Sequence, residues 1–373
     1  MLNMENLIKA NVFGKDAGNR EDIRINKKLP FVDKHILLNY YYIKDYCLDE
    51  KVLQDIIVWI YTCMGKYKIL TIELENVIYD NRLCYVILEC IVEYLAYSGI
   101  NVNIILKNTK YTNSNINTII DGVTKGRKVY ERYRKIAKYN AKENTYSSII
   151  MSDLCFLLKA YGVGEENSFR IADVAAELTG NALEHGRSDC LIDCMYTKQR
   201  VEYGGDKKEI KWISLIVMNV SGILLGDPLY IKYEVCKERE KYKEEENYPI
   251  ISEAYKYHQR DFSEKYGKRD FYLISSFQDR ITGRREIAYT GGTGLTTLIG
   301  SAKMDSNNSE CYVHSGNKKL IFNRNILGGE RDGLVGFNIR NEFIHYIPDL
   351  NYYVNSPLYI PGTAYNLNYF IRS

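Results

Sequence analysis

The stretch from Ser168 to Gly186, SFRIADVAAELTGNALEHG, constrains the fold more than any other part of the sequence. Apolar residues cover most of its helical circumference, as in helices that are buried in a protein core. These residues are Phe169, Ile171, Ala172, Val174, Ala175, Ala176, Leu178, Ala182 and Leu183. We predict a central buried helix with Ser168 as its N-cap and Gly186 as the left-handed residue that ends it.

A polar stripe interrupts this apolar surface. Its members are Asp173, Glu177, Asn181 and Glu184. Their spacing of i, i+4, i+8 and i+11 places them on one face of the helix. The stripe is either the exposed face of an ordinary amphipathic helix or a set of buried groups that need partners, because unpaired polar groups in a core are costly. In the second case a metal ion, water or a bound ligand would supply the partners.

A glycine-rich segment later in the chain predicts a phosphate-binding turn. It contains Gly291, Gly292, Thr293, Gly294 and Leu295, and a helix is expected over Leu295–Ala302. Backbone amides at a helix N-terminus bind phosphate when glycines allow a close approach. No Gly-Lys-Ser/Thr follows, so this is not a Walker A loop, and the pattern also lacks the third glycine of a dinucleotide-binding turn.

Two strands are expected directly after the central helix. Asp189–Thr197 and Lys211–Asn219 alternate like strands, and glycines at 204–205 lie between them, so we predict a hairpin. Its second strand ends in the segment Asn219-Val220-Ser221-Gly222-Ile223. The last predicted strand runs to Phe370 and begins near Gly362-Thr363.

Taken together, these segments resemble the motifs of the GHKL ATPases, the superfamily of gyrase, histidine kinases and mismatch-repair ATPases. The pattern Glu177-x-x-x-Asn181-Ala182-x-x-His185-Gly186 is similar to the N box, closest to the anti-sigma-factor kinase and histidine-kinase branch. Residues 219–223 stand where the family has its G1 box, Asp-x-Gly-x-Gly, with Asn219 for the aspartate and Ser221 for the first glycine. Residues 291–295 resemble the G2 box, and 362–363 match a Gly-Thr before the last strand.

The resemblance implies a nucleotide site. Asn181 would ligate Mg²⁺, and Glu177 would orient or deprotonate the attacking water. The amides of Gly292, Thr293 and Gly294 would cradle the phosphates of ATP, with Gly291 and Leu295 in the same turn. Asn219 and Thr363 would hold adenine beside Gly222. Glu184 and His185 would orient Asn181 or contact the phosphate end, and a structural role for His185 beside Gly186 is the alternative.

The N-terminal part predicts an α/β module. Strands are expected at His35–Tyr42, Ile69–Leu74 and Val102–Leu106, and helices at Leu48–Met64 and Leu83–Tyr97. This strand–helix–strand order predicts parallel βαβ pairing. The run from Ile69 to Lys107, which contains the turn ENVIYD, resembles a STAS-like domain. Phosphorylated STAS regulators carry Ser or Thr after such an aspartate, whereas Asp80 is followed by Asn81 and Arg82, which favours a module with only a packing role.

The predicted fold class is therefore α/β, with a C-terminal GHKL sandwich (a mixed sheet with helices on one face) and an N-terminal STAS-like domain. We expect a loose arm over 1–30, the STAS-like domain over 31–110, a linker and basic helix over 111–143, and the ATP-binding domain over 144–373. A lid insertion covers about 226–290, with helices at Tyr233–Asn247, Ile250–Phe262 and Phe271–Arg280. Further strands are expected at Cys311–His314, Leu320–Asn323 and Val335–Ile339.

Composition limits the partners. The net charge of +3 over 373 residues gives no argument for nucleic acid, and the basic, tyrosine-rich stretch 122–142 is better explained as a solvated connector than as a nucleic-acid face. No run of about eighteen apolar residues predicts a transmembrane helix, and no signal peptide is expected. Nine scattered cysteines without a C-x-x-C pair fit reduced thiols in the cytoplasm.

These observations lead to a functional hypothesis. The chain would bind ATP/ADP with Mg²⁺, hydrolyse ATP slowly, and switch its lid and N-terminal domain in bacterial signalling or defence, with a protein partner or a second copy as a homodimer. Two alternatives remain open. One is a protein serine/threonine kinase of the anti-sigma-factor kinase type, and the other is a non-catalytic nucleotide sensor.

Overall fold

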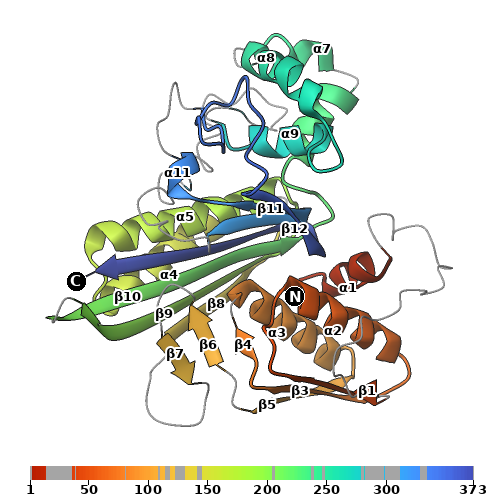
Figure 1. The fold of residues 1–373 in the computed structure, drawn as a ribbon, viewed down its shortest axis with the longest axis vertical. Coiled ribbons are helices and arrows are strands. Elements are labelled where there is room, and N and C mark those ends of the chain that lie inside the picture. The colour runs from red at the N-terminus through yellow and green to blue at the C-terminus, as the bar shows by residue number, and fades with distance from the viewer. Residues whose placement is uncertain are drawn as a thin grey trace. The chain divides into compact units, whose positions relative to one another are not determined.

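Residues 2–13, 36–37, 39–79, 81–107, 110–113, 118–121, 131–140, 145–203, 206–236, 239–245, 248–278, 281, 298, 311–327 and 334–372 are described by a computed structural model. The chain divides into two units (Figure 1). The first unit comprises Met1–Lys128 and Ser356–Pro361, and the second comprises Val129–Asn355 and Gly362–Ser373. Each unit is treated by itself below.

The first unit is an α/β module. Its elements are α1 (Met4–Phe13), β1 (Ile36–Leu37), β2 (Tyr40–Lys44), α2 (Glu50–Cys63), β3 (Ile69–Glu75), β4 (Ile78–Tyr79), α3 (Arg82–Tyr97), β5 (Asn101–Lys107), β6 (Lys110–Asn113) and β7 (Thr118–Asp121). One sheet has the order β1-β2-β3-β5 and a second has the order β4-β6-β7. Strands β2, β3 and β5 are parallel, and β1 is antiparallel to β2. The helices α2 and α3 lie on one face of the larger sheet (Figure 1).

Capping side chains begin both of these helices. The Asp49 carboxylate accepts the N–H of Val52 at 2.8 Å at the start of α2. The Asn81 amide oxygen accepts the N–H of Leu83 at 3.1 Å at the start of α3. Such caps satisfy backbone donors that have no partner inside the helix. The apolar faces of both helices are buried, and the parallel pairing of β3 with β5 confirms the predicted βαβ unit.

The N-terminal segments differ from the predictions in three places. Met4–Phe13 forms α1 with buried Leu7 and Ile8, whereas a loose arm was expected there. The strand expected over His35–Tyr42 is divided, because β1 turns back antiparallel onto β2. Part of the expected linker, Lys110–Asn113, is the strand β6. In each case tertiary packing orders a segment whose local pattern is weak.

Asn11 ties α1 to the C-terminal segment that belongs to the same unit. Its side chain is 4% exposed. The amide nitrogen donates to the carbonyl oxygens of Leu7 at 2.9 Å and Tyr359 at 2.7 Å, and the amide oxygen accepts the N–H of Tyr359 at 2.8 Å. Asn11 therefore acts as a strand-like partner for one residue of the 356–361 segment.

The second unit combines a sheet, two long helices and a helical group. Its elements are β8 (Glu131–Ala137), α4 (Tyr146–Ala160), α5 (Glu165–Glu184), β9 (Cys190–Tyr203), β10 (Asp206–Val220), α6 (Asp227–Tyr230), a π-helical turn (Ile231–Val235), α7 (Arg239–Tyr242), α8 (Tyr248–His258), a 3₁₀ turn (Gln259–Asp261), α9 (Lys268–Ser275), β11 (Tyr312–Ile321), α11 (Arg324–Leu327) and β12 (Tyr353–Arg372). The sheet order is β11-β12-β10-β9-β8. Helices α4 and α5 lie along one face of this sheet (Figure 1).

Strand β8 corrects the prediction of a basic helix. Its residues alternate, so Arg132 and Arg134 point to the same side of the strand. On that side they meet the fully buried Asp193 of β9, with Arg132 at 2.5 Å and Arg134 at 3.8 Å. The period of two in the basic residues therefore reflects cross-strand ion pairing. The sheet itself is antiparallel at β8–β9, β9–β10 and β10–β12, which also corrects the predicted mixed sheet.

Two later segments also differ from the predictions. The stretch Val335–Ile339 is not a strand, because Phe337 has a positive φ of 53° and the backbone turns there. The two short strands expected at 311–323 form the single element β11. The Phe322 N–H donates to the Cys311 carbonyl at 2.7 Å and Gly316 has φ 63°, so this element folds back at the predicted turn.

The helical group was predicted in outline only. The expected exposed helix Tyr233–Asn247 is a π-helical turn followed by α7, and Tyr233 and Tyr242 are buried. Lys232 is 2% exposed and its ammonium pairs with Glu245 at 2.7 Å. Glu245, a charged residue of the expected helix, therefore pairs with a buried lysine, which the sequence pattern alone does not reveal. Helices α8 and α9 agree with the helices expected over Ile250–Phe262 and Phe271–Arg280, apart from their ends.

His258 joins three parts of this group. It is buried, with Nε2 2.6 Å from the Phe343 carbonyl oxygen and Nδ1 2.7 Å from the Tyr266 hydroxyl. The carbonyl can only accept, so Nε2 carries the proton and Nδ1 accepts from the tyrosine in the neutral ring. Burial lowers the pKa of His258, while the Phe343 carbonyl, Glu342 and Asp261 oppose that shift.

We predict that Asn11→Ala destabilises the first unit by about 2–3 kcal/mol, because it removes the buried hydrogen bonds that the Asn11 amide makes with the N–H and the carbonyl of Tyr359. The free energy of unfolding from urea titration of the full chain measures this. Lys9→Ala is the control, since it removes only an exposed pair with Glu5 and should cost less than about 1 kcal/mol. Equal effects of the two variants would contradict the structural role of Asn11.

The buried neutral His258 predicts a loss of stability in acid. Its folded pKa lies below the unfolded value of about 6.5, so the unfolded state binds the proton more readily. The contribution to stability is therefore present above about pH 6.5 and falls below it, by at most about 1.4 kcal/mol per pH unit. Urea titrations between pH 7.5 and 5 measure it. His258→Gln should flatten this part of the curve, and an unchanged slope would refute the assignment.

Candidate functional site

Helix α5 carries the predicted polar stripe at the border of its buried side. Its core face includes Ile171, Val174 and Leu178, all fully buried. Along the stripe, Asp173, Glu177 and Asn181 are half-buried and Glu184 is exposed. Burial raises the pKa of Asp173. The stripe is thus intermediate between the two interpretations of the sequence, because its middle is partly shielded by protein and partly exposed.

The ends of α5 differ from the predicted caps. The helix begins at Glu165 after Gly164, and Ser168 is a buried residue of the first turns whose Oγ donates to the Val163 carbonyl at 3.2 Å. At the other end the left-handed residue is Arg187, with φ 49°, and Gly186 is not left-handed. The glycine is needed there for a different reason.

Gly186 allows the end of α5 to contact the end of β10. A Cβ atom at this position would overlap the amide nitrogen of Asn219 and would lie 2.5 Å from the Ala182 carbonyl oxygen. Real Cβ atoms do not approach other heavy atoms this closely, so any larger residue would displace Asn219 or the helix end. The sequence pattern Asn-Ala-x-x-His-Gly therefore includes a packing requirement that involves a residue 33 positions later, Asn219.

Asn219 lies at the centre of this contact. It is 4% exposed and stands opposite Thr363 of β12 and Cys190 of β9 in the sheet. Its amide oxygen accepts the Thr363 N–H at 2.9 Å, and its amide nitrogen donates to Ser188 Oγ at 3.3 Å. The residues predicted to hold adenine are therefore adjacent, and one lone pair of the Asn219 oxygen is already used.

The Gly362-Thr363 dipeptide has a conformation that only glycine allows. Gly362 has φ 153°, and a Cβ there would overlap the Asn219 carbonyl oxygen. Ser315 supports this corner, since its Oγ donates to the Gly362 carbonyl at 2.7 Å and accepts the Leu225 N–H at 2.9 Å. The Thr363 hydroxyl is 3.4 Å from the same Ser315 oxygen.

Sequence reasoning missed Ser188 and Ser315. Ser188 follows Gly186 in the turn between α5 and β9, and Ser315 was seen only as part of the predicted turn at 315–317. Neither belongs to a motif, and serine is common in turns for local reasons. Only the sheet register, which brings Gly362 beside Asn219, could have identified them.

The turn after β10 also accommodates Ser221, which stands where the G1-box pattern has glycine. Gly222 is exposed and has φ 79°, so it supplies the left-handed residue of this turn. The Ser221 hydroxyl oxygen accepts the Ile223 N–H at 3.1 Å. A serine at this position thus stabilises the turn through a side-chain hydrogen bond that glycine could not make.

The remaining predicted residues are not brought into this contact by the described structure. Glu184 is exposed near the end of α5, and His185 is its half-buried C-cap residue. Gly291, Gly292, Thr293, Gly294 and Leu295, like the expected helix Leu295–Ala302 apart from residue 298, lie outside the described residues. Within the described ranges, no group of three His, Cys, Asp or Glu side chains could hold a metal ion. This does not bear on the predicted Mg²⁺ ligand Asn181, because its side chain is an amide.

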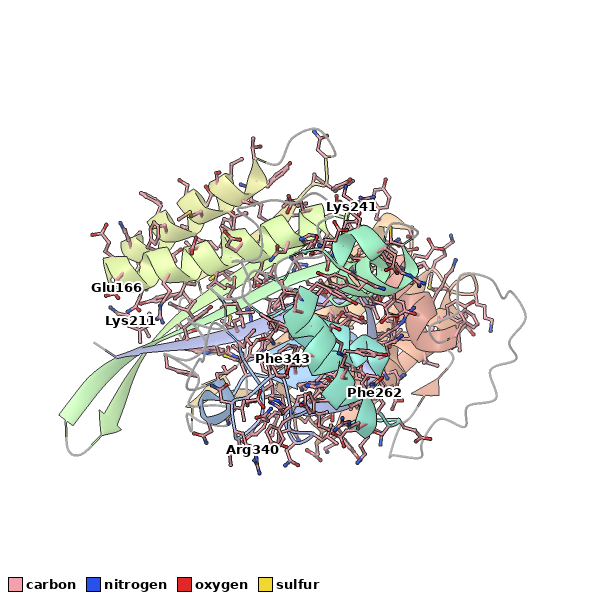
Figure 2. The ribbon with its side chains drawn as sticks, turned by 90° about the horizontal axis from the view of Figure 1, so that it is seen from above. Glu166, Lys211, Lys241, Phe262, Arg340 and Phe343 are labelled. Atoms are coloured by element: carbon pink, nitrogen blue, oxygen red, sulfur yellow. The ribbon has the colours of Figure 1, made fainter. Side chains whose placement is uncertain are left out.

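The candidate site lies at one end of the α5–β10 layer. At the opposite end the Lys211 ammonium donates to the Gly162 carbonyl at 2.5 Å, in the loop between α4 and α5. Figure 2 shows Glu166 and Lys211 close together at that far end. Asn219 is eight residues further along β10, about 26 Å away at 3.3 Å per residue. The polar end of α5, with Asn181 and His185, therefore lies at the Asn219 end.

Comparison with known proteins adds no assignment: no family model, curated protein or solved structure matches this chain. In the described parts of the chain no helix has the length and apolar character that a membrane crossing requires. The functional argument therefore rests on the residues and their geometry.

We predict that Gly186→Ala destabilises the second unit by about 2–4 kcal/mol, because the added methyl overlaps both Asn219 and the helix end. Gly180→Ala, inside α5, is the control. Its Cβ would lie 3.2 Å from the Ser147 hydroxyl, which can rotate away, so it should stay within about 1 kcal/mol of the wild type. Urea unfolding at pH 7.5 measures both. If Gly186→Ala is as stable as Gly180→Ala, the close contact with Asn219 is not present.

Proposed function

We propose that the second unit binds ATP with Mg²⁺ at the Asn219 end of α5 and hydrolyses it slowly, as a GHKL-type nucleotide-binding protein. One observation carries the proposal. Three segments that are far apart in the sequence, the N-box-like end of α5, the G1-like end of β10 and the Gly-Thr of β12, meet at the Asn219 side chain. The family resemblance pairs these segments in function, and the sheet register gives the pairing a physical basis.

Asn219 and Thr363 fit the role of adenine contacts. A carbonyl oxygen has two lone pairs, and the Asn219 oxygen uses one for the Thr363 N–H at 2.9 Å. The second can accept the exocyclic amino group of adenine, and the Thr363 hydroxyl can bind a ring nitrogen or a bridging water. Asparagine is neutral, so this hydrogen bond is weaker than the charge-assisted bond of an aspartate.

Asn181 and Glu177 fit roles at the phosphate end. They lie about one helical turn apart on the half-buried stripe of α5, so both can face the same ligand. An amide oxygen suits Mg²⁺, which usually binds one or two protein oxygens together with phosphates and water. The ion would neutralise phosphate charge. Glu177 would hold the attacking water, and the amides of Gly292, Thr293 and Gly294 would complete the phosphate site.

The architecture supports the same proposal. Helices on one face of a five-stranded sheet are what a GHKL sandwich needs, although the strand pairs β8–β9, β9–β10 and β10–β12 are antiparallel. In the first unit, β3, α3 and β5 fit a STAS-like module. There Asn81, at the position where phosphorylated STAS regulators carry the acceptor hydroxyl, caps α3. In this proposal the first unit either packs only or contacts a protein partner, in both cases without a phosphorylation switch at Asn81.

We predict that Asn181→Ala weakens Mg-dependent ATP binding at least about tenfold, whereas Glu177→Gln keeps binding and loses phosphate release. Glu166→Ala, at the exposed start of α5, is the control and should change neither. Calorimetry with ATP, ADP and GTP, with and without Mg²⁺, measures binding, and released phosphate measures turnover. ATP affinity unchanged in Asn181→Ala would refute the site.

The same assays separate the alternatives. Transfer of labelled phosphate from ATP to a protein would identify a kinase. Binding without transfer and without phosphate release would identify a nucleotide sensor, which the asparagine at 219 permits. Thermal stabilisation by nucleotide gives an independent readout of binding, because a ligand that binds only the folded state raises its stability by mass action.

A further inference from the structure

Strand β5 leaves one edge of the larger sheet of the first unit open. The order β1-β2-β3-β5 gives β5 a single strand neighbour, β3, among the described residues. All of its side chains are exposed or half-buried, and Ile105 and Leu106 are each 38% exposed. An open edge with apolar side chains on both faces is a template for pairing with another strand.

The hydrogen bonds of β5 define which backbone groups are free for such pairing. The N–H of Asn101 donates to Lys68 at 2.8 Å, and the carbonyl of Lys107 accepts from Asn76 at 2.7 Å. Both groups point toward β3. Backbone groups alternate along a strand, so the odd-numbered residues face β3. The N–H and C=O groups of Val102, Ile104 and Leu106 therefore point to the open edge.

We propose that β5 pairs with β5 of a second copy of the chain, antiparallel and two-fold symmetric about Ile104. In this register Ile104 faces Ile104 of the partner copy, and Val102 faces Leu106. These are the residues whose backbone groups point outward, so up to six inter-chain hydrogen bonds form: three donors and three acceptors from each copy. The two four-stranded sheets then become one continuous sheet of eight strands.

The side chains of β5 are complementary to themselves in this register. On the helix side Val102, Ile104 and Leu106 form an apolar row across the two copies. On the other face Asn103 lies opposite Ile105, and Asn101 opposite Lys107. The strand has one charged residue, Lys107, which pairs with Glu73 at 2.5 Å, so no like charges meet across the axis.

Two of the other described sheet edges, β1 and β8, are less suitable. Strand β1 has two residues, too few for a stable ladder. Strand β8, at the edge of the second unit's sheet, carries Arg132, Arg134 and Lys135, and edge charges oppose pairing. Strand β5 has seven residues and a single charged residue, Lys107, at its end, so it is a better pairing edge than either of these. The inference does not depend on the nucleotide site.

Charge substitution at the two-fold axis tests the proposal. Ile104→Lys places two ammonium groups opposite each other and should raise the dimer dissociation constant at least about tenfold, as should Ile104→Glu. An equimolar mixture of the two variants should restore the dimer, because lysine then faces glutamate. Ile105→Lys is the control, since residue 105 faces Asn103. Sedimentation velocity of the full chain at about 1–100 μM measures the mass of the species in solution, and circular dichroism checks the fold.

Each outcome decides the question. A wild-type dimer that is lost in both single variants, kept in Ile105→Lys and restored by mixing supports the β5 pairing. A monomeric wild type overturns it, as does a dimer that Ile104→Lys leaves unchanged, which would place the contact on another surface. Failure of the mixture to restore the dimer also overturns the two-fold register.

Discussion

The candidate site depends on the two hydrogen bonds and the close packing of the Asn219 side chain. Its oxygen accepts from Thr363, its nitrogen donates to Ser188, and Gly186 leaves the space that it fills. These contacts join the end of α5, the turn that follows it and two neighbouring strands. Because the amide is buried, each of its groups must be paired, and a buried polar group with fixed partners specifies one arrangement of the segments around it.

Much of the fold follows from local patterns. The strand-like apolar runs of β3 and β5, the apolar faces of α2 and α3, and the glycines between β9 and β10 predicted elements that are present. The failures have a common physical cause. Arg132 and Arg134 belong to a strand because Asp193, about sixty residues later, needs partners, and Met4–Phe13 is helical because tertiary contacts bury Leu7 and Ile8.

The candidate site shows the same limit. The order of the motifs predicted that Asn219 and Thr363 lie close together, and they are neighbours in the sheet. Their hydrogen bond was not predictable, because it requires the register of two strands separated by most of the second unit. The same applies to Gly186, which was assigned to a helix end for its conformational freedom and is instead required for its lack of a side chain.

Asparagine at position 219 holds the neighbouring segments together without the charge that an aspartate would bring to the same place. A buried carboxylate would accept from Thr363 as well, and it would bind a base amino group strongly, but it would also carry the cost of burying a charge. The neutral amide avoids that cost and adds a donor for Ser188 at 3.3 Å. The contact between α5, β10 and β12 is therefore held by hydrogen bonds of the protein itself, and in the nucleotide site that we propose the base would be bound more weakly. The proposed site would then suit a nucleotide whose binding changes the surrounding structure more than a nucleotide that is selected by its base.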